Sequence, residues 1–164
     1  MKILVVYYSY EGNTRFVADH IAEFFHADIQ ELKPKIDMHS RSFMKYVWGG
    51  KMVLMREKPD LEPLKFSPAD YDVVFIGTPV WAWTFTPAIN AFLTANPLEG
   101  KRVVLYYCHG GGPRGIADKL KSHLQGATII GEKGFQEPLK WRHEKAVLAV
   151  RTWCRELKSI LGIE

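Results

Sequence analysis

Short apolar runs rich in β-branched residues alternate with segments of helical periodicity along this chain. The clearest pair is the apolar run from Lys2 to Tyr8, followed by helically spaced apolar residues between Asn13 and Phe25. A strand that is apolar on both faces is typical of a parallel sheet covered by helices on both sides. Strands separated by helices also imply right-handed crossover connections. The pattern therefore predicts a doubly wound α/β domain with a parallel sheet.

The rest of the chain repeats the same alternation. Further strands are expected at 28–32, 73–76, 101–108 and 127–131, and further helices at 87–94, 115–124 and 144–161. No internal repeat, low-complexity tract or linker interrupts the series, and a chain of 164 residues can be buried around one core. We therefore expect five strands in a single domain that spans residues 1–164.

Composition and charge exclude several classes of protein. Apolar runs are too short to span a membrane, and a net charge of +4 is too small to favour nucleic-acid binding. Cys108 and Cys154 form neither a disulfide framework nor a CxxC pair, and the first residues do not resemble a secretory signal. The six histidines show no metal-ligand spacing. We expect a cytoplasmic protein without a bound metal.

The loop between the first strand and the first helix, Ser9–Thr14, has the composition of an anion site. Ligands of doubly wound sheets bind beyond the carboxyl ends of the strands. Gly12 allows the backbone to turn tightly and to approach a ligand closely, and the free N–H groups at a helix start attract phosphate. The loop is neither a GxxxxGK nor a GxGxxG motif. The alternative is a helix start that is merely capped by Ser9 or Asn13.

Two further loops follow neighbouring strands of the predicted sheet. The segment 78–87 carries Trp81, Trp83 and Phe85, whose rings either cap the core or cover a flat aromatic ligand. The segment 108–115 holds three consecutive glycines, which expose backbone groups to the edge of a planar heterocycle or form a flexible turn. The three loops together favour a ligand that combines a phosphate with a flat ring.

These motifs resemble those of the flavodoxin family. Ser9-Tyr10-Glu11-Gly12-Asn13-Thr14 looks like the FMN phosphate loop of flavodoxins, usually Ser/Thr-x-Thr-Gly-Asn-Thr, and Gly77–Trp81 looks like their second, flavin-flanking loop. The resemblance extends from Met1 to the last helix, without the long insertion of the long-chain type. It implies an FMN-binding fold with strand order 2-1-3-4-5.

The resemblance also implies a role for each loop residue. The phosphate would be held by Ser9, Gly12, Asn13 and Thr14, with backbone amides from Tyr10 and Glu11. The flavin pocket would be lined by Thr78, Pro79, Val80, Trp81 and Ala82, with Trp81 against one face of the ring. The pyrimidine edge would be bordered by His109, Gly110 and Gly111. No catalytic acid or base is expected, because FMN itself carries the redox chemistry.

Three departures from the family pattern bear on the role of the protein. Glu11 stands where the family often has threonine, and we expect it to point into solvent. The third loop lacks the tyrosine that commonly stacks on the flavin, and the chain is basic whereas electron-shuttle flavodoxins are typically acidic. Electron transfer through bound FMN to a partner protein is favoured. The alternatives are an NAD(P)H-dependent flavin or quinone reductase and a binding module without flavin.

The segment 35–58 is apolar at helical spacing, and the stretch from Lys33 to Lys58 carries the whole basic excess of the chain, with a local charge of +5 against +4 overall. A crossover helix between the second and third strands is the simplest interpretation. Its apolar positions, however, extend further round the helix than one buried face requires. A homodimer contact through residues 40–56, or a lid over the flavin, would use the surplus.

Overall fold

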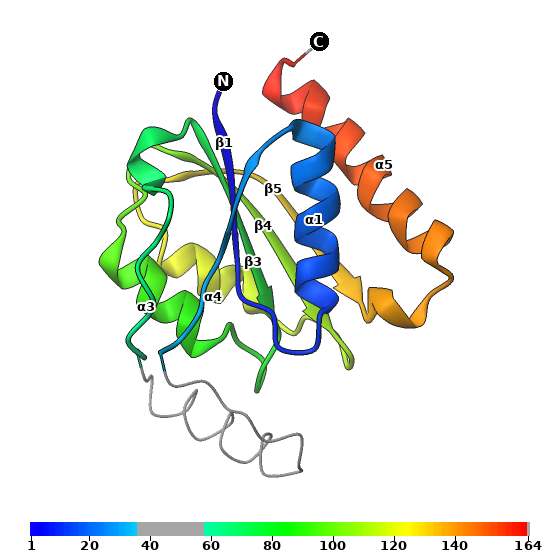
Figure 1. The fold of residues 1–164 in the computed structure, drawn as a ribbon, viewed down its shortest axis with the longest axis horizontal. Helices are drawn as coiled ribbons and strands as arrows, with labels where there is room; N and C mark the ends of the chain where they lie inside the picture. The colour runs from blue at the N-terminus through cyan, green and yellow to red at the C-terminus, as the bar shows by residue number, and fades with distance from the viewer. Residues whose placement is uncertain (36–57, 164) are drawn as a thin grey trace.

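The predicted alternation of strands and helices is present in the computed structural model, which describes residues 1–35 and 58–163. Segment 36–57, and with it the expected dimer contact at 40–56, lies outside the described residues. Five parallel strands form one sheet in the order β2-β1-β3-β4-β5 (Figure 1). The strands are β1 (Ile3–Tyr7), β2 (Asp28–Glu31), β3 (Val73–Pro79), β4 (Arg102–His109) and β5 (Thr128–Gln136). This order confirms the predicted doubly wound fold.

Helices cover both faces of the sheet, as Figure 1 shows. They are α1 (Asn13–Phe25), α3 (Pro87–Ala95), α4 (Ile116–Ser122) and α5 (His143–Leu161), with short 3₁₀ turns η1 (Pro68–Asp70) and η2 (Pro138–Lys140). In β1, Val5 and Tyr7 pack with α1 and α5, while Leu4 and Val6 pack with α3 and α4. The alternating side chains of a buried strand thus supply two separate cores. This explains why β1 is apolar at every position.

Two strands extend further than the sequence analysis predicted. β3 ends at Pro79 rather than at residue 76, because Gly77, Thr78 and Pro79 continue to pair in register with β4. β5 ends at Gln136 rather than at residue 131. Its last residues are mostly polar or partly exposed, since they lie on an edge strand, so the apolar pattern ends before the backbone pairing does. Both extensions shift the strand ends closer to the candidate site.

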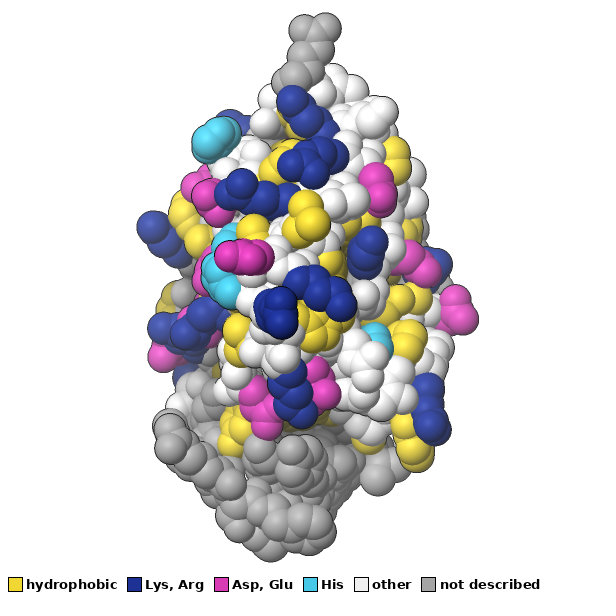
Figure 2. All heavy atoms as spheres, turned by 90° about the vertical axis from the view of Figure 1, so that its right-hand side faces the viewer, with side chains coloured by type: hydrophobic (Ala, Val, Ile, Leu, Met, Phe, Trp, Pro, Cys, Tyr) yellow, Lys and Arg dark blue, Asp and Glu magenta, His cyan; other side chains and the backbone are white. Residues whose placement is uncertain are grey.

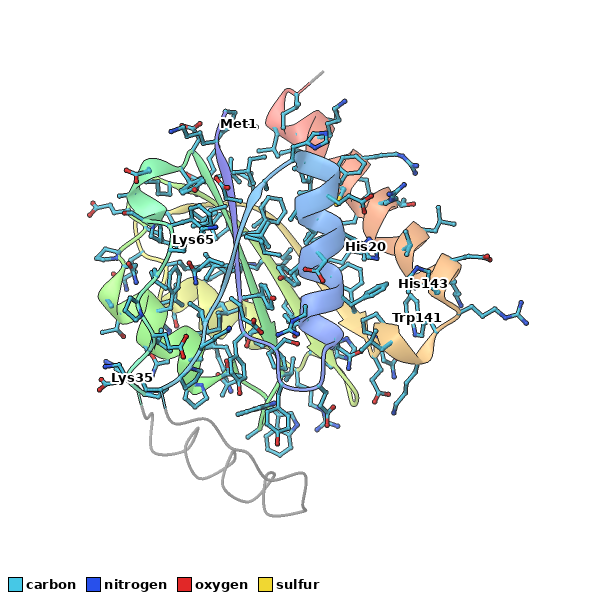
Figure 3. The ribbon with its side chains drawn as sticks, viewed as in Figure 1. Met1, His20, Lys35, Lys65, Trp141 and His143 are labelled. Carbon is cyan, nitrogen blue, oxygen red and sulfur yellow. The ribbon has the colours of Figure 1, made fainter. Side chains whose placement is uncertain are left out.

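Helices α1 and α5 lie side by side on one face (Figure 1). Their contact includes the Phe16 ring, whose centroid lies 4.6 Å from that of His20 and 5.8 Å from that of His143 (Figure 3). Figure 2 shows Lys and Arg side chains on this side of the molecule interleaved with Asp and Glu. One such pair is Arg151 and Glu23, 3.1 Å apart. The basic character is therefore dispersed on this side. Within residues 1–35 and 58–163, no helix combines the length and apolar character that a membrane crossing requires.

Tyr106 of β4 lies across the backbone of β3 at Gly77, its register partner. A Cβ atom at Gly77 would overlap the Cζ and hydroxyl atoms of the Tyr106 ring. The ring is fully buried, and its hydroxyl has no hydrogen-bond partner among the described residues. Burial accordingly raises the pKa of Tyr106 well above its ordinary value. Position 77 thus requires glycine, because the Tyr106 ring fills the space that a Cβ atom would occupy.

Substitution at this contact should change the free energy of unfolding. Gly77→Ala should lower it by about 1–3 kcal/mol, because the added methyl overpacks a closed core. Tyr106→Phe should leave stability unchanged or raise it by about 1 kcal/mol, because it removes a hydroxyl without a partner. Urea unfolding monitored by circular dichroism measures both effects. Gly111→Ala is the control, since a Cβ there meets no atom within 4 Å. Equal losses at Gly77 and Gly111 would refute this account.

Candidate functional site

Three loops meet at the carboxyl edge of the sheet, after the adjacent strands β1, β3 and β4 (Figure 1). Backbone hydrogen bonds join the strand ends: Tyr8 N–H donates to the Gly77 carbonyl at 3.1 Å, and Val80 N–H donates to the Cys108 carbonyl at 2.9 Å. The chain connects β1 to β2 on one side and continues through β3 and β4 on the other. The loops therefore lie at the topological switch point, where doubly wound proteins bind their ligands.

The first loop ends in a helix start whose N-cap residue has no side chain. Gly12 is the N-cap residue of α1 and has a φ of 94°, in the left-handed region that favours glycine. Its carbonyl accepts the first helical hydrogen bond from Phe16 N–H at 2.9 Å. Ser9 Oγ accepts a hydrogen bond from Arg15 N–H at 3.2 Å. The N–H groups of the first helical turn have no partner within the helix, and N–H groups in this position commonly bind anions.

Two side chains expected at the phosphate make other contacts. Asn13 Oδ1 accepts a hydrogen bond from Leu139 N–H at 3.1 Å. Thr14 is buried, and its side chain hydrogen-bonds the Cys108 thiol, whose pKa burial raises to about 12 and this hydrogen bond lowers in part. Glu11 is exposed. The backbone N–H groups are therefore the principal anion donors of this loop.

The second loop is a tight hairpin between Trp81 and Thr84. Each of these residues donates its N–H to the carbonyl of the other, at 2.9 Å in both directions. The two central residues, Ala82 and Trp83, have φ values of 45° and 60°. Such a turn normally uses Asn-Gly, because other side chains are strained in the left-handed region. Thr78 holds the base of the loop: it is fully buried, and its Oγ1 accepts Thr86 N–H at 3.2 Å.

The two tryptophans of this loop occupy different environments. The Trp81 ring is half-buried and meets the rings of Tyr8 and Tyr10 edge to face, with centroids 5.8 and 5.9 Å away. The Trp83 side chain is 59% exposed and makes neither contact. Trp81 thus belongs to an aromatic cluster between the first and second loops. It is the tryptophan placed to meet a flat ligand at the switch point.

The third loop presents mainly backbone. His109 Nδ1 accepts a hydrogen bond from Gly112 N–H at 3.1 Å, which closes the loop on itself. Gly112 has a φ of 102°, and a Cβ on either Gly111 or Gly112 would meet no atom within 4 Å. Burial lowers the pKa of His109, although the Glu137 carboxylate opposes this shift. The ring is therefore neutral near pH 7 and can accept the hydrogen bond at Nδ1.

The segment 136–140, which we call the 136–140 turn, joins the third loop to the first and was missed in the sequence analysis. Gln136 Nε2 donates to the Gly110 carbonyl at 3.1 Å, and Glu137 N–H donates to the His109 carbonyl at 3.1 Å. At its other end, Leu139 bonds Asn13 and covers Gly12, where a Cβ would lie 3.3 Å from Leu139 Cδ1. The sequence could have indicated this turn, because β5 is parallel to β4 and must end at the same edge of the sheet as the three loops.

Backbone strain is concentrated at this edge. Five described residues other than glycine have a positive φ, and four of them lie in the second loop, the third loop or the 136–140 turn: Ala82, Trp83, Arg114 and Glu137. The fifth, His26, is the C-cap of α1, a usual place for this conformation. Strained backbone that is kept by the surrounding structure gathers at functional sites. The distribution supports the location of the site independently of the sequence motifs.

The sheet order and the three loops at its carboxyl edge define a flavodoxin-like α/β protein. A family model described as Flavodoxin matches residues 2–140. The chain belongs to the flavodoxin family. No curated protein matches the chain.

Solved structures agree with this fold. A candidate flavoprotein from Bacteroides eggerthii is 26% identical, with a TM-score of 0.79 and 99% of each chain covered. A flavoprotein in complex with FMN from Lactobacillus acidophilus is 20% identical, with a TM-score of 0.68 over 85% of this chain and 95% of that one. The two-electron reduced flavodoxin of Megasphaera elsdenii is 21% identical, with a TM-score of 0.55 over 90% and 96% of the two chains.

The contact between Asn13 and Leu139 predicts that Asn13 orders the 136–140 turn. Asn13→Ala should lower the free energy of unfolding by about 1 kcal/mol, through the loss of one hydrogen bond. It should also speed hydrogen exchange at the amide of Leu139. Ser9→Ala is the control, because it removes the acceptor of Arg15 N–H and leaves the turn untouched. Unchanged exchange at Leu139 in the Asn13 variant would show that this contact does not hold the turn.

The lowered pKa of His109 predicts a loss of stability in acid. Folding disfavours protonation of this ring, so the unfolded chain binds more protons and stability falls as the pH drops below about 6.5 and through the folded pKa. His109→Ala should reduce this dependence. Proton NMR titration of the ring and unfolding at several pH values measure the two quantities. A folded pKa at or above the ordinary value would contradict the prediction.

Proposed function

We propose that the protein binds one FMN at the carboxyl edge of the sheet and transfers electrons through it to a partner protein. The proposal is carried by the convergence of three loops on one site: a helix start with glycine at its N-cap, an aromatic cluster around Trp81, and a backbone-rich loop after His109. Membership of the flavodoxin family supports it, as does the FMN bound by the Lactobacillus acidophilus flavoprotein. FMN supplies the redox chemistry, and the protein supplies position and electrostatics.

The residues of the site fit both ends of FMN. The first turn of α1 offers backbone N–H groups to a phosphate dianion. The N-cap residue Gly12 has no side chain to cap them, and Ser9 Oγ bonds the Arg15 N–H. Trp81 offers a flat apolar surface that is already held by Tyr8 and Tyr10. At the third loop, the space beside Gly111 and Gly112 holds no chain atom within 4 Å of a Cβ position. Backbone groups there can approach the edge of a heterocycle closely.

The same residues would set the electrostatics of the flavin. Trp81 excludes water from one side of the pocket, and a water-poor site disfavours added negative charge. The His109 ring, kept neutral by burial, adds no positive charge to offset it. In this account the chain itself provides no acid or base. It would bind the ring and limit its contact with water.

An NAD(P)H-dependent flavin or quinone reductase is the alternative function. The net charge of +4 favours it over a typical acidic shuttle, as does the absence of an aromatic residue from the third loop. Anaerobic mixing of the FMN-loaded protein with NADH or NADPH decides between the two. Rapid bleaching of the flavin would reject a pure shuttle. A non-flavin binding module is tested by the absorbance spectrum alone, since protein that takes up no FMN at micromolar concentration would contradict the main proposal.

Substitution of the two tryptophans tests the place of the flavin ring. Trp81→Ala should weaken FMN binding about fivefold or more, because stacking contributes on the order of 1 kcal/mol beyond burial. It should also restore flavin fluorescence and raise the potential of the most reduced couple. Trp83→Ala should leave all three unchanged, and fluorescence titration measures the affinities. If only Trp83→Ala has these effects, the ring lies against the other tryptophan.

A further inference from the structure

Trp83 is displayed at the tip of the second loop instead of being buried. Its side chain is 59% exposed, and no other tryptophan in residues 1–35 and 58–163 is classed as exposed. The hairpin that presents it keeps Ala82 and Trp83 in the left-handed region, where side chains other than glycine are strained. Exposure of an indole and strain in its backbone are both unfavourable. Their combination in one loop suggests that the exposed ring has a use.

Two basic residues from the neighbouring segment contact Trp83, one at its backbone and one at its ring. Lys119 Nζ of α4 donates a hydrogen bond to the Trp83 carbonyl at 2.9 Å. The Arg114 guanidinium lies 5.7 Å from the centroid of the Trp83 ring, within the range of a cation–π contact. Arg114 is itself in the left-handed region, with a φ of 37°. Contacts from the third loop and from α4 therefore hold the exposed Trp83 in this position without a partner protein.

These three residues form a positively charged surface, which we call the Trp83 patch: Trp83, Arg114 and Lys119. Neither Arg114 nor Lys119 has a carboxylate partner within the described residues. Asp118, which is exposed on α4, is the acidic neighbour in sequence. Trp and Arg are the residue types most enriched among the energetic centres of protein interfaces. A preformed Trp–Arg pair with a free positive charge fits acidic side chains on a protein.

The patch also lies close to the proposed flavin site. Trp83 is two residues from Trp81 in the same hairpin, and Arg114 belongs to the same loop as Gly111. A protein docked on Trp83 and Arg114 would therefore cover the second and third loops. Electron transfer between proteins needs only a small, transient interface, which charge complementarity guides into place.

We propose that the Trp83 patch docks the acidic surface of a protein electron carrier beside the flavin. The inference rests on the proposed function, because docking would serve electron transfer from the flavin, but docking itself can be measured without FMN. Opposite charges should steer the partner to the patch, so association should weaken with salt. The ring and the guanidinium would supply the contact itself, and Lys119 holds the backbone of the hairpin at Trp83.

Stopped-flow kinetics with two haem proteins tests the proposal. The FMN-loaded protein is reduced with dithionite and mixed anaerobically with ferric cytochrome b5, which is acidic, or ferric cytochrome c, which is basic; one electron passes from the reduced flavin to the haem iron. The rate with cytochrome b5 should fall about tenfold as sodium chloride rises from about 50 to about 500 mM. Trp83→Ala and Arg114→Gln should each slow electron transfer to cytochrome b5 severalfold and leave the rate with cytochrome c unchanged. Arg155→Gln, the same charge change on an exposed position of α5, is the matched control and should have no effect.

A second measurement needs no flavin. Calorimetric titration of the FMN-free protein with cytochrome b5 should show salt-sensitive binding that Trp83→Ala and Arg114→Gln weaken and Arg155→Gln does not. If the chain takes up no FMN, the proposed function fails while this measurement still reports on docking. Equal rates and affinities for the wild type and both patch variants would overturn the inference. It would also be overturned if these variants lost only NADPH binding, because the patch would then serve a dinucleotide.

Discussion

The structure depends on the burial of both faces of its three central strands. β1, β3 and β4 contribute side chains to two cores, one under α1 and α5 and the other under α3 and α4. Because both faces are covered, the ends of these strands are the places where a ligand can reach the backbone. At the carboxyl end, the bonds from Tyr8 to Gly77 and from Val80 to Cys108 hold the three loops at fixed positions. The two packed cores thus hold the loops of the site in place.

The site divides its work between backbone and side chains. At the first loop, Asn13 and Thr14 turn their side-chain oxygens to Leu139 and Cys108, so backbone N–H groups remain to face an anion. This arrangement tolerates Glu11 in a position where a carboxylate would otherwise oppose a phosphate, because the residue is exposed. At the second loop the reverse holds. Thr78 and Thr86 anchor the hairpin, and the Trp81 ring is the surface that the proposed flavin would meet.

Sequence patterns predicted those elements of the fold that depend on residues close together in the chain. Apolar runs located β1, β3 and β4, and the placement of Gly12 before a helical segment located the turn at the start of α1. The polar end of β5 escaped prediction, because an edge strand needs no apolar side chains to stay paired. The contact of Asn13 with Leu139 joins residues 126 positions apart, so no pattern near either residue could announce it. The family resemblance distinguished Trp81 from Trp83, but the exposure of Trp83 follows from the left-handed turn at Ala82 and Trp83, which no local pattern predicted.

The 136–140 turn would couple the two ends of the proposed FMN to each other through the protein. It is bonded to Asn13 beside the phosphate loop and to His109 and Gly110 beside the ring-binding loop. A phosphate that orders the first loop would also restrict the turn and, through it, the third loop. Binding of the ring at the third loop would then cost less conformational entropy. By thermodynamic reciprocity, a ring held at the third loop would favour phosphate binding to the same extent. The two halves of the ligand would then be coupled by the protein as well as by their own covalent chain.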